Sequence, residues 1–191
     1  LKSKSITRLK TNLQKGTVGF DGTPPEVKLV SPADNTYINI NTLLSFRTAD
    51  NIATTLTEIF VDSIKIENLT ANNGTLTNTN VDCTSVIEGN HQWTVRCEDG
   101  VGLSSTAAAR NIIVDKTAPT ITLVSPNNNS AIGDDVLIDI TITDNYVVDS
   151  TSYNKISLNS TNWPEGINTL EVNATDSAGN KAMKTFTFTV D

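Results

Sequence analysis

The sequence predicts an all-β protein made of two tandem Greek-key β-sandwiches, and its composition is the first reason. Thr, Ser, Asn, Val and Ile are abundant among the 191 residues while Met occurs once, a balance that favours strands and turns over helices. The chain is 37% hydrophobic and 18% charged, which excludes a disordered chain and suffices for one or two buried cores.

An internal repeat is the second reason. The stretch TPPEVKLVSPADNTYININTLLSFRTADN, from Thr23, aligns without a gap with TAPTITLVSPNNNSAIGDDVLIDITITDN, from Thr117, at an offset of 94 residues. At an offset of 77, EGNHQWTVRCEDGVG from Glu88 aligns with EGINTLEVNATDSAG from Glu165. The second copy is therefore seventeen residues shorter. The surplus of the first copy includes ENLTANNGTLTNTN, which predicts a long loop or an added edge hairpin.

Alternation within the apolar runs is the third reason. In VLIDITITD, Ile138, Ile140 and Ile142 fall on one face of a strand, and in QWTVRC the residues Trp93 and Val95 do the same. Side chains alternate across a strand, so each run has one face to bury. Each copy contains several such runs, punctuated by Pro, Asn, Asp and Gly, which is typical of a sandwich of about seven strands.

Three motifs give the chain a family resemblance. They are the opening D-x-T-x-P, the strand EG-x-N/H-x-[LW]-x-V and the turn D-x-[AV]-G that follows it. With them, residues 22–191 resemble the bacterial and archaeal Ig-like repeats found in tandem in surface adhesins and S-layer-type proteins. The resemblance implies immunoglobulin-like sandwiches arranged end to end. The disulfide typical of vertebrate Ig domains is absent, because Leu44 and Phe46 occupy its place on the second strand.

Prolines mark where each domain begins. Pro25 and Pro119 cannot donate a backbone hydrogen bond, and each holds the preceding residue in an extended conformation. We therefore expect Ig-like domain 1 over residues 22–115 and Ig-like domain 2 over residues 116–191. The linkers DGT and DKT are too short for a flexible tether, so the two domains are expected to form a rod.

Residues 1–21 stand outside the two copies. Ile6, Leu9 and Leu13 recur at helical spacing before Gly16, which suits a helix C-cap. The pentapeptide TVGFD that follows aligns instead with NIIVD, the last strand of domain 1. Two interpretations stay open: the remnant of a preceding domain, or an arm that pairs with an identical subunit as a donated strand.

Aspartates are expected to converge at the domain ends. In a Greek-key sandwich the second and the penultimate strands run in the same direction, so the loops after them lie where the chain enters the domain. This predicts one group at the upper end of domain 1 and one at the domain junction, the latter joined by Asp34 or Glu88: Asp21, Asp50 and Asp99, and Asp115, Asp144 and Asp176. Carboxylates beside backbone carbonyls suit calcium, which takes about six to eight oxygen ligands. The family resemblance also implies junctional calcium, whereas a purely structural role in turns is the alternative.

Two further features fit an extracellular protein. Cys83 and Cys97 lie on either side of the EGNH turn, and a disulfide closing this loop of about 15 residues would add about 3 kcal/mol; two buried thiols are the alternative. Five N-x-[ST] sequons are candidates for glycosylation, although several would arise by chance in so Asn- and Thr-rich a chain. They are Asn68, Asn73, Asn128, Asn159 and Asn173.

Several functions are excluded on the sequence. His91 is the only histidine, so neither a Ser-His-Asp triad nor a histidine-based zinc site can be assembled, and we expect no enzyme. A net charge of -7 opposes nucleic-acid binding. No apolar run in this fragment approaches the roughly 18 to 20 residues that span a bilayer.

The predicted function is therefore a non-enzymatic extracellular structural or adhesion module. We expect a rod-like spacer or assembly unit of a cell-surface protein, such as an S-layer, adhesin or surface filament, whose partners are neighbouring Ig-like domains or identical subunits. The alternative is a carbohydrate- or ligand-binding accessory module of an adhesin or secreted hydrolase. Trp93 is expected in the core, which leaves Trp163 and Tyr37 to stack on a sugar.

Overall fold

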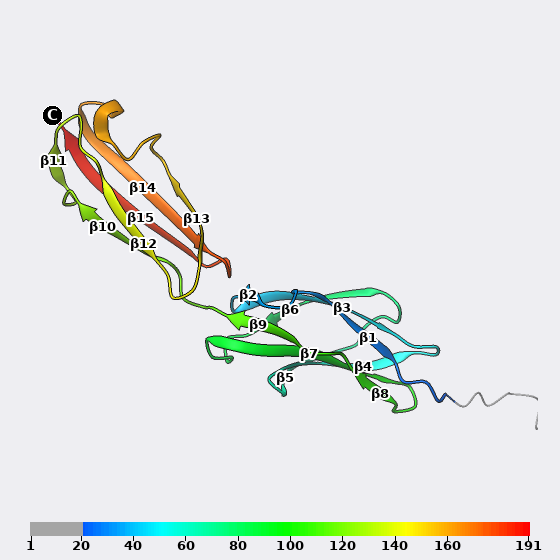
Figure 1. The fold of residues 1–191 in the computed structure, drawn as a ribbon. Helices are drawn as coiled ribbons and strands as arrows, with labels where there is room; N and C mark the ends of the chain where they lie inside the picture. Colours follow the sequence, from blue (N-terminus) through cyan, green and yellow to red (C-terminus); the bar gives the residue numbers. More distant parts are fainter. Residues whose placement is uncertain (1–20) are drawn as a thin grey trace, which may run out of the picture.

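The computed structural model describes residues 21–191 and shows two β-sandwiches that follow one another along the chain (Figure 1). The described residues form fifteen strands and one short 3-10 turn, η1 (Ser160–Asn162), which confirms the all-β fold. Residues 1–20, on which most of the expected N-terminal arm falls, lie outside the described part. Among residues 21–191, no helix has the length and hydrophobicity needed to cross a membrane.

Domain 1 contains strands β1 to β9, arranged in two sheets. One sheet has the order β1-β3-β6, and the other has the order β2-β9-β7-β4-β5 with β8 paired to β7. Neighbouring strands are antiparallel except for the parallel pair β2 and β9. The strands are β1 (Glu26–Ser31), β2 (Thr36–Ile38), β3 (Asn41–Ala49), β4 (Thr54–Val61), β5 (Ile64–Leu69), β6 (Leu76–Asp82), β7 (Gly89–Asp99), β8 (Ser104–Thr106) and β9 (Arg110–Val114).

Domain 2 repeats this topology with fewer strands. One sheet contains only β10 and β12, and the other has the order β11-β15-β14-β13. The parallel pair β11 and β15 corresponds to β2 and β9 of domain 1. The strands are β10 (Thr120–Ser125), β11 (Ser130–Ile132), β12 (Asp139–Thr143), β13 (Val148–Tyr153), β14 (Gly166–Asp176) and β15 (Lys181–Val190).

Each domain has a core of its own between its sheets. In domain 1 the largest fully buried side chains are Trp93 and Phe46, each 0% exposed. In domain 2, Phe188 and Leu170, the latter aligned with Trp93, are also 0% exposed. The alternation expected for QWTVRC is confirmed, since every second residue of β7 is buried.

The surplus of the first copy forms one additional strand in each sheet. β5 pairs with β4 and β6 pairs with β3, so the stretch is neither a plain loop nor a hairpin whose strands pair with each other. Domain 2 has no counterpart of β5, and its only trace of β6 is a single bridge between Leu137 and Asn159. The two sheets of domain 2 therefore end at β12 and β13.

The predicted disulfide between Cys83 and Cys97 is wrong. Both residues are buried free thiols. Cys83 follows β6, where its backbone N–H donates to the Ile40 carbonyl (2.8 Å), whereas Cys97 lies eight residues along β7 from Gly89. Eight strand residues span roughly 26 Å, and a disulfide needs Cα atoms within about 7 Å.

Candidate metal sites at the domain ends

Three aspartates meet at the domain junction. Asp115 follows β9, Asp144 follows β12 and Asp176 is the last residue of β14. Each offers a carboxylate oxygen that lies within 4.8 Å of those of the other two. The parallel course of β12 and β14 brings their ends to the point where the linker enters domain 2, so the fold itself assembles this group, called here the junction triad.

One oxygen of each carboxylate in the junction triad holds its own turn. Oδ1 of Asp115 accepts from the Thr117 N–H (3.1 Å) and Oδ1 of Asp144 accepts from the Tyr146 N–H (2.9 Å). Oδ1 of Asp176 accepts two backbone N–H groups, including that of Ala178 at 2.9 Å. The structural role expected of aspartate in turns is therefore present, and it leaves the second oxygen of each carboxylate for another partner.

Two of the three Oδ2 atoms of the junction triad lack a hydrogen-bond donor among the described residues. Oδ2 of Asp115 and Oδ2 of Asp144 are buried and accept no hydrogen bond from the described residues, whereas Oδ2 of Asp176 accepts from the Asn180 amide (2.9 Å). A buried carboxylate oxygen without a partner is costly. None of the ion pairs between residues 21 and 191 involves the triad, so its negative charge is not offset by Lys or Arg.

Burial and mutual repulsion act on the central carboxylate. Asp115 is 0% exposed. Burial raises the pKa of Asp115 above its ordinary value, and the neighbouring charges of Asp176 and Asp144 raise it further. A bound cation would offset the negative charge of Asp115 and so favour its deprotonated form.

The upper end of domain 1 carries the same arrangement. Asp21, Asp50 and Asp99 also offer carboxylate oxygens within 4.8 Å of one another, and we call them the upper triad. Oδ1 of Asp99 accepts the N–H groups of Val101 (2.8 Å) and Leu103 (2.9 Å). Oδ2 of Asp21 and Oδ2 of Asp99 are buried without a partner among the described residues. The two triads occupy equivalent positions of the repeat.

Glu88 and Asp34 do not join the junction triad. Oε1 of Glu88 instead accepts the Lys116 N–H (2.7 Å) and the Thr117 hydroxyl (2.8 Å), which fastens the linker to domain 1. Asp34 accepts the N–H of Asn111 within domain 1 (2.6 Å). The sequence carries no indication of the linker contact, because a single Glu in a turn does not show which neighbouring segment it meets in space.

Other contacts across the junction were also missed. The rings of Tyr37 and Tyr146 lie 5.7 Å apart between centroids, and Asn180 Nδ2 donates to the Asp115 carbonyl (3.0 Å). Tyr37 belongs to β2 of domain 1, whereas Tyr146 and Asn180 lie in loops of domain 2. Their positions in the sequence give no signal for such pairing, because it depends on how the two domains meet.

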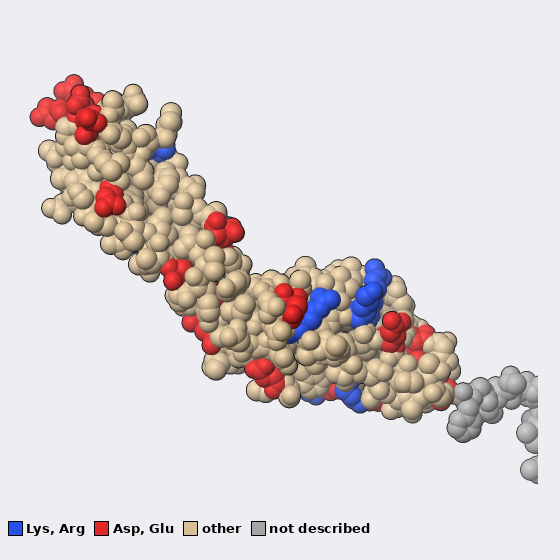
Figure 2. All heavy atoms as spheres, in the orientation of Figure 1, with Lys and Arg blue, Asp and Glu red and all other residues tan. Residues whose placement is uncertain are grey.

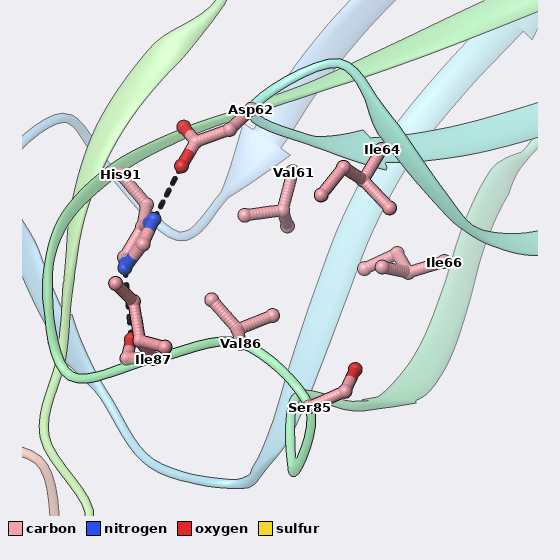
Figure 3. A pocket seen from close by; sticks show the side chains of 8 residues that line it. All are labelled: Val61, Asp62, Ile64, Ile66, Ser85, Val86, Ile87 and His91. Atoms are coloured by element: carbon pink, nitrogen blue, oxygen red, sulfur yellow. Dashed lines mark hydrogen bonds and ion pairs between the residues drawn. The ribbon is translucent and has the colours of Figure 1, made fainter.

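The only histidine of the chain lies beside an apolar hollow of about 280 Å³ on domain 1. Its ring nitrogens face the Asp62 carboxylate and the Ile87 carbonyl (2.8 Å) (Figure 3). With both nitrogens engaged and 9% of His91 exposed, no free base is available there. The hollow is lined by Val61, Asp62, Ile64, Ile66, Ser85, Val86, Ile87 and His91.

The tryptophans lie in the cores. Trp93 is 0% exposed, and Trp163 is 7% exposed, with its ring 5.9 Å from that of Phe188. Lys155 Nζ lies 4.8 Å from the centre of the Trp163 ring, a cation–π distance. Neither indole offers the open face that stacking on a sugar requires, and the Tyr37 ring packs against that of Tyr146 at an interplanar angle of 60°.

The five sequons differ in how free their amides are. Asn68 is exposed on the edge strand β5, and its side chain makes no hydrogen bond to residues 21–191. The Asn73 side chain bonds both the N–H and the carbonyl of Asp50 (2.7 and 2.8 Å). The remaining three also use their side chains: Asn128 accepts from Thr187, Asn159 caps η1, and Asn173 donates to Glu171.

Comparison with known proteins places the second copy in a family. The model of the bacterial Ig-like domain matches residues 108–191. The expected resemblance to bacterial Ig-like repeats is confirmed for these residues, which contain all of domain 2. Domain 1 is the other copy of the same repeat and has the same topology. Bacterial Ig-like domains are typical of extracellular modules and are generally non-catalytic. No curated protein matches the chain.

Solved structures with a similar fold include modules from several bacterial proteins. The fibronectin(III)-like modules of Clostridium thermocellum CbhA are 14% identical, with 87% of this chain and 94% of that chain covered and a TM-score of 0.48. A 1.5-MDa bacterial ice-binding adhesin is 15% identical over 90% of this chain and 66% of that chain (TM-score 0.37). A Bacteroides ovatus protein, SGBP-B, is 12% identical over 89% and 48% (TM-score 0.35). At these scores the likenesses support no argument about function.

Proposed function

We propose that the chain is a rod-like, non-enzymatic extracellular module of a cell-surface protein, stiffened by calcium in the junction triad. The observation that supports the proposal is the convergence of Asp115, Asp144 and Asp176 within 4.8 Å, with buried, unpartnered oxygens on two of them. The match to an extracellular domain family supports the location.

The donors of the junction triad suit calcium. Three carboxylates supply hard oxygen ligands and enough negative charge for a divalent cation, and calcium accepts such ligands in flexible geometry. The described residues bring no histidine or cysteine to the triad, which disfavours zinc. The ion would give the unpartnered oxygens of Asp115 and Asp144 the partner they lack.

A calcium ion at this point would link the elements that set the angle between the domains. Asp115 belongs to the linker, Asp144 follows β12 and Asp176 ends β14, so the two latter lie at the end of domain 2 that faces it. The linker is already fastened to domain 1 through Glu88. The ion would therefore complete a connection from domain 1 through the linker to domain 2, which is what a spacer needs in order to resist bending.

The upper triad extends the same proposal to the other end of domain 1. Asp21 lies before β1, where the chain enters the domain, and beside it Asp50 follows β3 and Asp99 ends β7. A second calcium ion would fix the direction in which the preceding residues leave the domain. The chain would then bind two calcium ions at equivalent positions of its repeat.

Calorimetry and scattering test the proposal together. In calorimetry, two calcium ions should bind per chain and the melting temperature should rise. In small-angle X-ray scattering, calcium should narrow the range of interdomain angles. Asp144→Asn with Asp176→Asn keeps an oxygen for each turn but removes two charges, so one ion should be lost. Asp134→Asn, an exposed aspartate of domain 2 outside both triads, is the matched control. No heat of binding, with melting unchanged by chelator, would overturn the proposal.

A further inference from the structure

Strand β12 of domain 2 is paired along one edge only. Its counterpart in domain 1, β3, pairs with β1 on one side and with β6 from Asn41 to Arg47 on the other. β12 pairs with β10, and beyond the bridge between Leu137 and Asn159 its second edge meets no strand of residues 21–191. The sheet therefore ends in an open row of backbone donors and acceptors, the feature to which a further strand can pair.

The core beneath this edge is incompletely covered. In domain 1, Phe46 and Thr48 of β3 are each 0% exposed. The residues aligned with them in domain 2 are Ile140 and Ile142, and both are only half-buried although isoleucine is more apolar than threonine. The difference follows from the missing counterparts of β5 and β6. A strand added beside β12 with apolar side chains facing inward would complete the burial.

The acidic charge around β12 indicates which kind of strand could pair with its open edge. Asp139 on β12 and Asp149 on β13 are exposed, and neither strand has a Lys or Arg. Domain 2, residues 116–191, has nine acidic and four basic residues, and acidic side chains predominate on the face of it shown in Figure 2. Two such edges repel one another, because like charges on facing strands are destabilising. A basic segment that places apolar residues such as Leu9 and Leu13, four positions apart, on one face when extended fits instead.

Only one segment of the chain has these properties. Residues 1–20 contain no acidic residue and form the longest such stretch. Their basic residues are Lys2, Lys4, Arg8, Lys10 and Lys15, and their larger apolar residues are Leu1, Ile6, Leu9, Leu13, Val18 and Phe20. We propose that the open edge of β12 receives residues 1–20 of a second copy of this chain as an added β-strand.

The position of the two partners makes this pairing directional. Residue 21 enters domain 1 at the end remote from domain 2 (Figure 1). Donation from one copy to domain 2 of the next therefore joins copies head to tail. Such a heterologous contact does not close as a two-fold dimer does, so it links successive copies into a ring or an open chain of subunits, depending on the rotation between them. The module would then assemble end to end, a property beyond that of a spacer.

The test is the mass of the full chain in solution as concentration rises, measured by light scattering after size exclusion. We expect oligomers that grow with concentration and that disappear when residues 1–20 are deleted. Asp139→Lys with Asp149→Lys should reduce association at least tenfold. Asp134→Lys with Asp191→Lys makes the same change in net charge at exposed positions away from β12 and β13 and should leave association unchanged.

Further variants separate strand pairing from simple charge attraction. Leu9→Ser with Leu13→Ser keeps every charge of the segment and should also abolish the oligomers, and hydrogen exchange of β12 amides should slow only in the full chain. A chain that stays monomeric at all concentrations would overturn the proposal. So would oligomers that survive deletion of residues 1–20, which would indicate pairing between domains 2, or equal loss of association in both charge-reversal variants.

Discussion

Glu88 and Thr117 are joined by a hydrogen bond of 2.8 Å between their side chains. The contact connects the turn before β7 of domain 1 to the linker that opens domain 2. The same Glu88 oxygen accepts the Lys116 N–H (2.7 Å), and these hydrogen bonds lower the pKa of Glu88, that to Thr117 most. One surface carboxylate thus holds Lys116 and Thr117, the last two residues of the linker.

Replacing this carboxylate should loosen the junction without unfolding either domain. Glu88→Ala removes the acceptor for both linker groups, so we expect a wider distribution of interdomain angles by small-angle X-ray scattering and faster exchange of the Lys116 amide. Glu165→Ala is the matched control, because Glu165 is the repeat counterpart of Glu88 and is exposed with no hydrogen bond to the described residues. Equal effects of the two variants would show that the contact does not set the angle.

The raised pKa of Asp115 predicts opposite pH responses with and without calcium. In the presence of chelator, protonation of Asp115 removes the cost of burying its negative charge and the repulsion from Asp176 and Asp144. Its contribution to the free energy of unfolding is then fully present below the ordinary aspartate pKa of about 3.9 and is lost as pH rises through the higher folded value. Calcium needs the deprotonated carboxylates, so the stabilisation by calcium should increase over the same range.

Urea unfolding between about pH 4 and 7 measures both responses. The native protein is compared with Asp115→Asn. The pKa values of Glu58 and Asp62 are lowered in the fold, so these two groups make the free energy of unfolding rise with pH, opposite to the effect of Asp115. The difference between the native protein and this variant isolates Asp115. A difference that does not depend on pH in chelator would contradict the prediction.

The separate cores predict separate losses of stability. Phe46→Ala should destabilise domain 1 by about 3 to 5 kcal/mol, and Phe188→Ala should destabilise domain 2 by a similar amount, since each ring is fully buried and its removal leaves a cavity. The two rings belong to different hydrophobic clusters, so each variant should lower one unfolding transition. The other transition, followed by NMR signals of the unmutated domain, should not move. A single transition lowered equally by both changes would show that the domains unfold together.

The local pattern of the sequence was sufficient to predict which strands have an apolar face. Trp93 and Val95 follow the period of two that a pleated strand imposes, and both are 0% exposed. Ile140 follows the same pattern and is only half-buried, because burial also depends on neighbouring strands. The periodicity shows which face of a strand is apolar but not whether another strand covers it.

The aspartate triads show where topology can be inferred. Asp115, Asp144 and Asp176 lie far apart in the chain, yet the alignment of the two copies and the common direction of two strands were enough to expect them at one end. The predicted disulfide is wrong because the spacing of Cys83 and Cys97 along the chain does not fix the distance between them in space. Eight residues of extended strand carry Cys97 well away from the end where Cys83 lies.

The all-β fold, the repeat and the end of each sandwich at which the acidic side chains gather could all be predicted from the residue pattern. These features follow from the period of two, from turn residues and from self-alignment, which are all local or internal to the chain. Three features are visible only in the folded molecule: the contact of Glu88 with the linker, the contact of the Tyr37 ring with Tyr146, and the open edge of β12. Such features depend on which surfaces meet in space. The residue pattern along one strand does not show which other segment lies beside it.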